Sequence, residues 1–328
     1  MKKIISVLLL ISICLFTFGC SNAGNTYKER QFFAMDAVLT VRLWGCADSA
    51  DTYFGRIKEI LSEIEKALSR TDAESDVSRI NRDRTAGELS PHTLAVLAVA
   101  KNVMTQTDGA YLPTMGAISD LWRQAGEENA LPDATLLAEA LDAARAGFTL
   151  ENGVCTLPCA GALLDLGGIG KGYAVDRILA YLTEARIEGA LVSFGSSVAT
   201  LGKKSDGKPF RISLRSPSNP SATVGALNAP TGVLSVSGDY ERFVTVNGTR
   251  YHHIIDPATG YPAASGISSA SVLAAGGAYS DALSTALLVM GREKAAALAE
   301  SLQVEAIFIT ADGTLTHTAG LNGIFERN

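Results

Sequence analysis

The sequence has no excess of basic residues and little charge of either sign. Charged residues make up 19% of the 328 residues, and the formal net charge is −6 at pH 7. A protein that binds nucleic acid or anionic lipid headgroups through a broad surface needs clustered lysine and arginine. The composition therefore argues against a nucleic-acid-binding function.

Cysteine is also scarce, and its spacing does not suit a metal. The five cysteines are Cys14, Cys20, Cys46, Cys155 and Cys159, with no CxxC pair and no cluster of cysteine with histidine. Structural zinc sites need such clusters, so we expect none. We interpret the last three as structural, and Cys155 and Cys159 are close enough in sequence to form a labile disulfide across a tight turn.

The chain further lacks internal repeats and long linkers. Its hydrophobic fraction of 47% and its length suffice for one large domain or two ordinary ones with a core. The linker-like stretches inside the body are short, at residues 203–209 and 216–221. We therefore find no boundary between domains within residues 31–328.

The N-terminus is typical of an exported protein. Lys2 and Lys3 precede an apolar run over residues 4–18, which ends at Gly19-Cys20. This pattern predicts a secretory signal peptide over residues 1–19. A small residue before cysteine resembles a bacterial lipobox, although Thr17 stands where leucine is usual. An ordinary cleaved signal or an uncleaved anchor are the alternatives.

The lipobox reading fixes the expected organisation and location. Cys20 would carry the lipid and hold the protein on the bilayer, and residues 20–30 would form a polar tether. Residues 31–328 would be one catalytic domain outside the cytoplasm, facing the periplasm or the cell surface.

Hydrophobic periodicity predicts alternating helices and strands. Period-two or short apolar runs predict strands at 36–44, 190–194, 210–214, 267–273 and 305–309. Apolar residues at three- and four-residue spacing predict helices at 51–69, 90–107, 133–145, 173–186 and 277–302. Asn152-Gly153 and Asn247-Gly248 are typical of tight hairpin turns, so the strands should pair antiparallel. The expected class is α+β.

A glycine-rich segment ahead of the helix at 173–186 is suited to a phosphate. Four glycines and Lys171 lie between Asp165 and Asp176. Glycine lets the backbone approach a ligand, and a helix N-terminus offers free N–H groups. The spacing fits neither the dinucleotide fingerprint nor the Walker loop. A tight turn that only packs a helix on a sheet is an equally good explanation of this segment alone.

Two more motifs follow it. They are Ser-Val-Ser-Gly-Asp-Tyr-Glu-Arg-Phe at 235–243 leading into His-Ile-Ile-Asp-Pro-Ala-Thr-Gly-Tyr-Pro at 253–262, and Asp-Ala-Leu-Ser-Thr at 281–285. With these segments in order, the chain from residue 31 onward resembles the FAD:protein FMN transferase family of ApbE-type lipoproteins. The resemblance implies an ApbE-like (T-fold-related) architecture of mixed, largely antiparallel sheets with packed helices.

The resemblance also implies the reaction. FAD would be bound with Mg²⁺, and its FMN half would move to a Ser or Thr hydroxyl of an extracytoplasmic flavoprotein acceptor, releasing AMP. Asp281 and Thr285, one helical turn apart, would bind Mg²⁺ with the carbonyl of Gly168. Asp281 could otherwise be only a helix N-cap.

The resemblance assigns roles to two further groups of residues. Lys171 would hold the pyrophosphate, Asp165 the nucleoside, and His253 would be the general base, because a histidine that titrates near neutrality can take a hydroxyl proton. Asp256 is predicted to act with it; alternatively, His253 and Asp256 pair only to order their loop. The expected cofactor-contacting residues are Met35, Ala110, Tyr111 and Ile254, although a methionine is more often core filler.

Two positions depart from the family pattern. Leu112 occupies a position that usually carries aspartate, and Gly195-Ser196-Ser197 replaces a more usual Gly-Gly-Asn or Gly-Gly-Asp. Neither touches the expected metal ligands. Two other functions remain open: an FAD pyrophosphatase, in which water replaces the protein hydroxyl, and a lipoprotein that binds flavin without catalysis.

Overall fold

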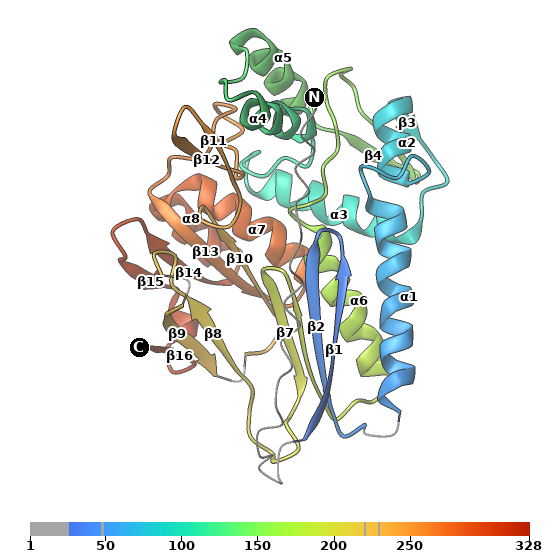
Figure 1. Cartoon of the computed structure of the whole chain (residues 1–328), viewed down its shortest axis with the longest axis vertical. Coiled ribbons are helices and arrows are strands. Elements are labelled where there is room, and N and C mark those ends of the chain that lie inside the picture. The colour runs from blue at the N-terminus through green and yellow to red at the C-terminus, as the bar shows by residue number, and fades with distance from the viewer. Residues whose placement is uncertain (1–25, 47–48, 220, 229) are drawn as a thin grey trace, which may run out of the picture.

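The protein is built on one large antiparallel sheet with helices along one face (Figure 1). This computed structural model describes residues 26–46, 49–219, 221–228 and 230–328. The predicted signal peptide and Cys20 lie outside the described residues. Among the described residues, no helix combines the length and the apolarity needed to cross a bilayer.

The described helices and strands follow in chain order. The α-helices are α1 (Ala50–Leu68), α2 (Asp76–Asp83), α3 (Pro91–Gln106), α4 (Gly116–Glu128), α5 (Ala134–Arg145), α6 (Gly170–Glu184), α7 (Gly277–Met290) and α8 (Arg292–Ser301). The strands are β1 (Tyr27–Ala34), β2 (Ala37–Trp44), β3 (Thr85–Ala86), β4 (Thr149–Glu151), β5 (Val154–Thr156), β6 (Gly189–Phe194), β7 (Ser197–Gly202), β8 (Arg211–Arg215), β9 (Thr223–Asn228), β10 (Val233–Gly238), β11 (Phe243–Val246), β12 (Thr249–His252), β13 (Ile267–Ala274), β14 (Glu305–Thr310), β15 (Leu315–His317) and β16 (Phe325–Arg327).

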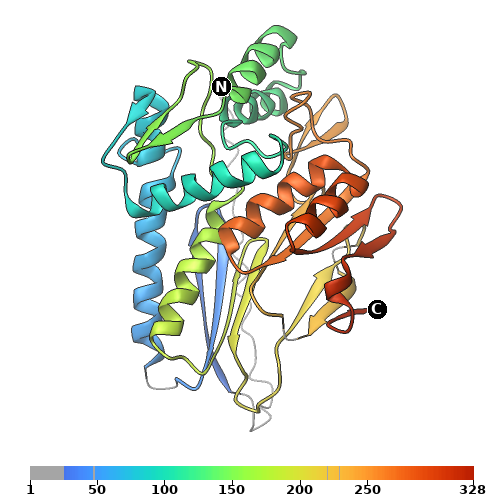
Figure 2. The ribbon, with the colours of Figure 1, turned by 180° about the vertical axis from the view of Figure 1, so that it is seen from behind.

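The large sheet draws its strands from nearly the whole described chain, with β1 at one edge and β15 at the other. Its strand order is β1-β2-β6-β7-β10-β13-β14-β15, and every neighbouring pair is antiparallel. Alternation along the strands sends Leu39, Val41 and Val192 into the main core, because successive side chains point to opposite faces. Figure 2 shows α1, α6 and α7 along that face.

A smaller sheet packs on the opposite face of the large sheet. The three-stranded sheet β16-β9-β8 packs there through Ile212 and Leu227, which share a buried cluster with Leu234 and Leu273 of the large sheet. A third unit forms a cap from α4, α5 and the β11–β12 hairpin. Trp122 joins its parts by donating from Nε1 to the carbonyl oxygen of Gly260 at 2.7 Å.

Most predicted elements are confirmed, and so is the α+β class. The predicted strands and the first three helices appear within two residues of their expected bounds. Both hairpins form, and their asparagines adopt the left-handed backbone that such turns need, with φ of 51° at Asn152 and 49° at Asn247. The helix predicted from residue 173 begins three residues earlier, at Gly170.

Two predictions are wrong. The single helix expected over 277–302 is broken at Gly291, whose φ of 77° ends α7 and starts α8. The boundary expected after Arg30 falls inside a strand, since residues 27–34 of β1 pair in register with β2. The polar composition of this segment reflects its mostly exposed position at the sheet edge.

Cys46, Cys155 and Cys159 are free thiols, so the disulfide considered for the last two is not formed here.

Helices α6 and α7 meet at a pair of glycines. A Cβ added at Gly172 would lie 2.0 Å from the carbonyl oxygen of Gly277, so no larger residue fits. The two helices also cap each other. Asp176 of α6 accepts from the N–H groups of Gly277 and Ala278, and Asp281 of α7 accepts from the N–H of Gly172 at 3.0 Å. Each carboxylate therefore satisfies otherwise unpaired N–H groups at the start of the other helix.

This crossing predicts an unequal response of two glycines to alanine. Gly172→Ala should lower the free energy of unfolding by at least about 2 kcal/mol, because the helices must separate to admit the methyl group. Gly55→Ala, in α1 where an added Cβ meets nothing within 4 Å, should raise it by about 0.5–1 kcal/mol. Urea unfolding of both variants measures this, and equal effects would contradict the steric argument.

Candidate active site

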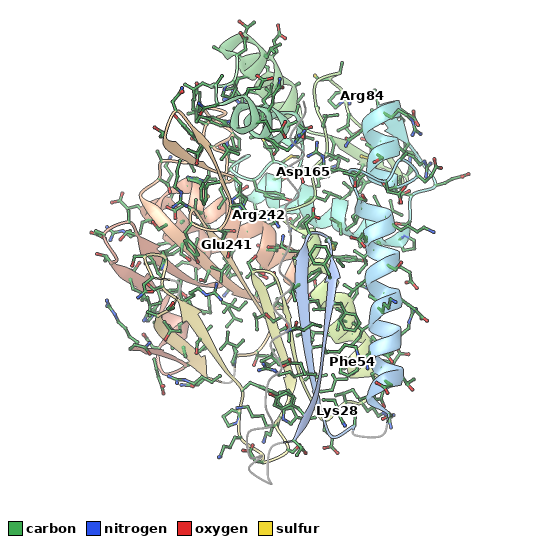
Figure 3. All side chains as sticks on the ribbon, viewed as in Figure 1. Lys28, Phe54, Arg84, Asp165, Glu241 and Arg242 are labelled. Carbon is green, nitrogen blue, oxygen red and sulfur yellow. The ribbon has the colours of Figure 1, made fainter. Side chains whose placement is uncertain are left out.

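The glycine-rich turn links the end of an extended segment to α6. Asp165 donates its N–H to the carbonyl oxygen of Pro113, and its Oδ1 accepts from the N–H of Gly167 at 2.9 Å. The N–H of Gly170 donates to the carbonyl oxygen of Leu166, which closes the turn. The turn is thus fixed by its own hydrogen bonds, with the Asp165 side chain at its start (Figure 3).

Lys171 reaches across this turn toward the sheet. Its Nζ donates to the carbonyl oxygen of Gly167 at 2.7 Å. Its side chain passes over Gly195, in the turn between β6 and β7, where a Cβ would lie 2.9 Å from Lys171 Cδ. Gly195 has a φ of 56°, so glycine suits both the backbone and the close approach. The ammonium is therefore held at the start of α6, beside the sheet.

The three expected metal ligands lie close together. Asp281 is 3% exposed, and its Oδ2 meets the start of α6 at Gly172. Thr285, one turn further along α7, has its Oγ1 3.8 Å from where a Cβ at Gly168 would lie. Carboxylate, hydroxyl and carbonyl oxygens are all hard ligands that Mg²⁺ accepts.

The electrostatic state of Asp281 favours a cation nearby. Burial raises the pKa of its carboxyl group, opposed by the charge of Lys171 and the Gly172 N–H. A bound cation would stabilise the ionised form that burial disfavours. In the described part of the chain, no three His, Cys, Asp or Glu residues cluster as a metal site. Three protein oxygens would leave about half of an octahedral Mg²⁺ shell to water and to the phosphates of a substrate.

Ser237 supports the Thr285 hydroxyl, a role that the sequence did not reveal. Its Oγ lies 3.1 Å from Thr285 Oγ1 and 2.8 Å from Ser284 Oγ. A hydroxyl that offers a lone pair to a metal can still donate its hydrogen to a neighbour. Ser237 belongs to the second motif, and Asp176 to the first, but neither had an assigned role.

Tyr111 brings an unpaired hydroxyl to the same place. The side chain is 5% exposed, and its Oη has no hydrogen-bond partner among the described residues. Burial raises the pKa of Tyr111, and the carboxylates of Asp281 and Asp165 raise it further, so the group stays a donor at neutral pH. A buried donor without a partner is rare in folded proteins. It fits a site in which a ligand oxygen supplies the partner.

The other residues expected to contact the cofactor differ in where their side chains lie. Met35 has a φ of 49° and places its Cε 2.7 Å from a Cβ position at Gly170, so it lies against the glycine-rich turn. Ala110 is half-buried beside Tyr111. The side chain of Ile254 instead packs in the core cluster under α7, and its carbonyl oxygen accepts from the N–H of Ala263. Met35 is thus placed to meet a ligand, whereas the Ile254 side chain is not.

His253 is oriented by a backbone carbonyl. Its Nδ1–H donates to the carbonyl oxygen of Arg242 at 3.1 Å, in the loop between β10 and β11. A carbonyl can only accept, so the proton of the neutral ring sits on Nδ1 and the lone pair on Nε2. The Arg242 side chain in turn reaches the carbonyl oxygen of Asp36 at 3.4 Å, next to Met35.

His253 is neutral at pH 7. Desolvation by the surrounding protein lowers its pKa to about 4, the Arg242 hydrogen bond opposes this, and the nearby charges of Arg242 and Lys171 lower the pKa further. The His253 side chain is exposed to solvent, which limits this desolvation. The neutral imidazole has a free Nε2 lone pair to accept a proton, but its lowered pKa differs from the titration near neutrality that the sequence analysis expected.

Asp256 does not pair with His253. Its Oδ1 accepts from the N–H of Ala258 at 2.8 Å, and its backbone bonds to Tyr261 and Gly260. The prediction that Asp256 acts with His253 is therefore corrected: Asp256 closes the turn that follows the histidine, as aspartate commonly does by binding the backbone two residues on.

The family comparison agrees with the motifs. A family model described as the ApbE family matches residues 35–308. The chain is 34% identical to an FAD:protein FMN transferase of Vibrio cholerae, over 82% of this chain and 83% of the relative. It is 30% identical to an FAD:protein FMN transferase of Treponema pallidum, over 95% and 93% of the two chains.

Solved structures share the fold. The crystal structure of an ApbE protein from Thermotoga maritima superposes with a TM-score of 0.83 at 29% identity, covering 92% of this chain and all of that one. The flavin transferase ApbE from Vibrio cholerae gives a TM-score of 0.78 at 28% identity, covering 90% of this chain and 97% of that one.

The environment of His253 predicts its titration. We expect its ring to titrate below the ordinary histidine pKa of about 6.5, because desolvation disfavours the charged form and protonation would add a third positive charge near Arg242 and Lys171. The unfolded chain binds this proton from about pH 6.5 downward, whereas the folded chain binds it only near the lowered pKa, so stability is lost as the pH falls from about 6.5 toward the folded pKa and levels off below it. NMR titration of the ring protons measures the pKa, with His253→Asn to assign the signal. A midpoint near 6.5 would contradict this environment.

Proposed function

The chain belongs to the ApbE family, and we propose that it is an FAD:protein FMN transferase. It would move the FMN half of FAD to a Ser or Thr hydroxyl of a flavoprotein and release AMP. One observation carries this proposal. The glycine-rich turn with Lys171 meets Asp281 and Thr285 where α6 crosses α7. His253 connects to the same turn through Arg242, which reaches the carbonyl of Asp36 beside Met35.

The reaction can be followed at the level of bonds. The acceptor hydroxyl oxygen forms a bond to the phosphorus of the FMN half, and the bond from that phosphorus to the oxygen of the AMP phosphate breaks. The hydroxyl proton goes to Nε2 of His253, and AMP leaves with the electron pair. Lys171 and the start of α6 hold the pyrophosphate, and Asp165 accepts hydrogen bonds from the nucleoside.

We also propose that the site uses Mg²⁺. Asp281, Thr285 and the carbonyl of Gly168 would hold it, as supported by their hard oxygens, by the buried carboxylate and by the Ser237 contact to Thr285. When bound, Mg²⁺ would polarise the phosphoryl oxygens and stabilise the charge on the departing phosphate.

Two other functions use the same residues. If water rather than a protein hydroxyl reaches His253, the enzyme is an FAD pyrophosphatase that yields FMN and AMP. A protein that only binds flavin would keep FAD and release no AMP. Incubation of the purified protein with FAD, Mg²⁺ and a candidate acceptor domain separates the three. Fluorescent acceptor on a denaturing gel indicates transfer, free FMN with AMP indicates hydrolysis, and unchanged FAD indicates binding alone.

Asp281→Asn should abolish this activity without unfolding the protein. The amide oxygen can still accept from the Gly172 N–H, but the negative charge is lost, so we expect AMP release to fall by roughly a hundredfold or more. Mg²⁺ should also stop raising the melting temperature in the presence of FAD. Asp133→Asn, at the exposed N-cap of α5, is the matched control and should behave like the wild type. Unchanged AMP release in Asp281→Asn would rule out the metal site.

The N-terminus supports a further proposal about location. We propose that the protein is exported, lipidated at Cys20 and attached to the outer face of the cell membrane, where its acceptor would also lie. The apolar run and the Gly19-Cys20 pair support this. Cells fed a radioactive fatty acid should label the wild type but not Cys20→Ser, and the variant should move from the membrane fraction to the soluble one. A membrane-bound, unlabelled wild type would indicate an uncleaved anchor.

A further inference from the structure

Arg70 contacts Asp165 and has no role in the proposed reaction so far. It lies in the loop after α1, and its Nη1 donates to Asp165 Oδ2 at 2.9 Å. Its Nη2 donates to Asp120 Oδ2 of α4 at 2.7 Å and to the carbonyl oxygen of Gly116 at 3.4 Å. One guanidinium thus joins the start of the glycine-rich turn to the first helix of the cap.

The guanidinium of Arg70 is closely packed against its neighbours on the cap side. A Cβ at Gly116 would lie 3.2 Å from Arg70 Nη2 and 2.8 Å from the carbonyl oxygen of Leu163. Gly116 also donates its N–H to that carbonyl, two residues before Asp165. The guanidinium therefore fills a narrow seam between the cap and the segment that leads into the turn.

Stability alone is a weak explanation for an arginine here. Its side chain is 25% exposed, and its buried Nε has no hydrogen-bond partner among the described residues. Partly buried ion pairs recover little more than the cost of desolvating their charges, and an unpaired buried donor adds to that cost. A well-packed apolar side chain would fill such a seam at least as favourably.

The geometry gives Asp165 a fixed orientation with capacity to spare. Its Oδ1 accepts from the Gly167 N–H and its Oδ2 from Arg70. A carboxylate offers about four lone-pair directions, so two remain for a ligand. Two donors on different oxygens also fix the rotation of the carboxylate plane, which sets where a ligand donor must lie.

We propose that Arg70 is a positioning residue for the nucleoside half of the substrate, acting through Asp165. This rests on the proposed function, in which Asp165 meets the nucleoside of FAD. Because Arg70 acts on that half alone, its loss should weaken the binding of AMP and FAD and leave FMN binding unchanged. Through Asp120, it also makes the position of the cap helix α4 part of nucleoside recognition.

Calorimetric titration of the mature protein in Mg²⁺ tests this with AMP, FAD and FMN as separate probes. Arg70→Met should weaken AMP binding by roughly tenfold or more, since a charge-assisted bond that orients the carboxylate is lost. Arg70→Lys should recover only part of this, because a single ammonium cannot reproduce the two-armed contact. Arg79→Met is the matched control: Arg79 likewise bonds an acid, Asp76, and a backbone carbonyl, that of Gly87, but not Asp165.

A double-mutant cycle separates positioning from general damage. If Arg70 acts through Asp165, then Arg70→Met with Asp165→Asn should bind AMP no more weakly than Asp165→Asn alone. Additive losses, or AMP binding by Arg70→Met equal to that of the wild type, would overturn the inference. A loss of FMN binding equal to the loss of AMP binding would do so too. A wild type that binds AMP and FAD but never releases AMP would instead refute the transferase proposal.

Discussion

The close approach of α6 and α7 at Gly172 and Gly277 is the constraint on which the site depends. The two helices carry different parts of the proposed site: α6 begins at the glycine-rich turn, and α7 carries Asp281 and Thr285. Because each helix supplies the carboxylate that caps the other, neither start can move without unpairing N–H groups of its neighbour. Asp281 is not the N-cap of its own helix, because α7 begins at Gly277 after the N-cap Gly276. Its carboxylate instead accepts from the Gly172 N–H of α6, and the same carboxylate is the metal ligand in the proposed enzyme.

Burial shifts the pKa values of the acid and the base of this site in opposite directions. It raises the pKa of Asp281 and lowers the pKa of His253, so that it disfavours the charged form of each. Lys171 opposes the shift of the acid and adds to that of the base. A cation beside Asp281 and an anionic pyrophosphate beside Lys171 would restore favourable partners to both, which couples metal and substrate binding.

Sequence reasoning recovered most of the elements because they depend on local signals, and it recovered the family because its motifs are contiguous in sequence. Apolar spacing located β2, α1 and α3, and contiguous motifs located Asp165, Lys171 and Asp281. What it missed depends on contacts between distant segments. The break at Gly291 lies within a helical apolar pattern, and β1 reads as polar because it is an exposed edge strand. Likewise, no local pattern tells that Asp256 turns back on Ala258 while the carbonyl of Arg242 holds His253, or that Arg70 reaches Asp165 from 95 residues away.

The two departures from the family pattern have different consequences in the fold. Leu112 is buried next to Tyr111, so it adds apolar packing where an aspartate could have received a ligand donor. Ser197 instead bonds Ser235 at 2.8 Å, and Ser235 bonds Ser280 of α7 at the same distance. This serine chain fastens the β6–β7 turn to the helix that carries Asp281 and Thr285. The serine at position 197 therefore helps to hold the helix that carries the proposed metal ligands. Only Leu112 removes a polar group from the cofactor side. Neither departure falls on Asp281, Thr285 or His253, so both bear on the surroundings of the proposed site and not on its expected metal ligands or base.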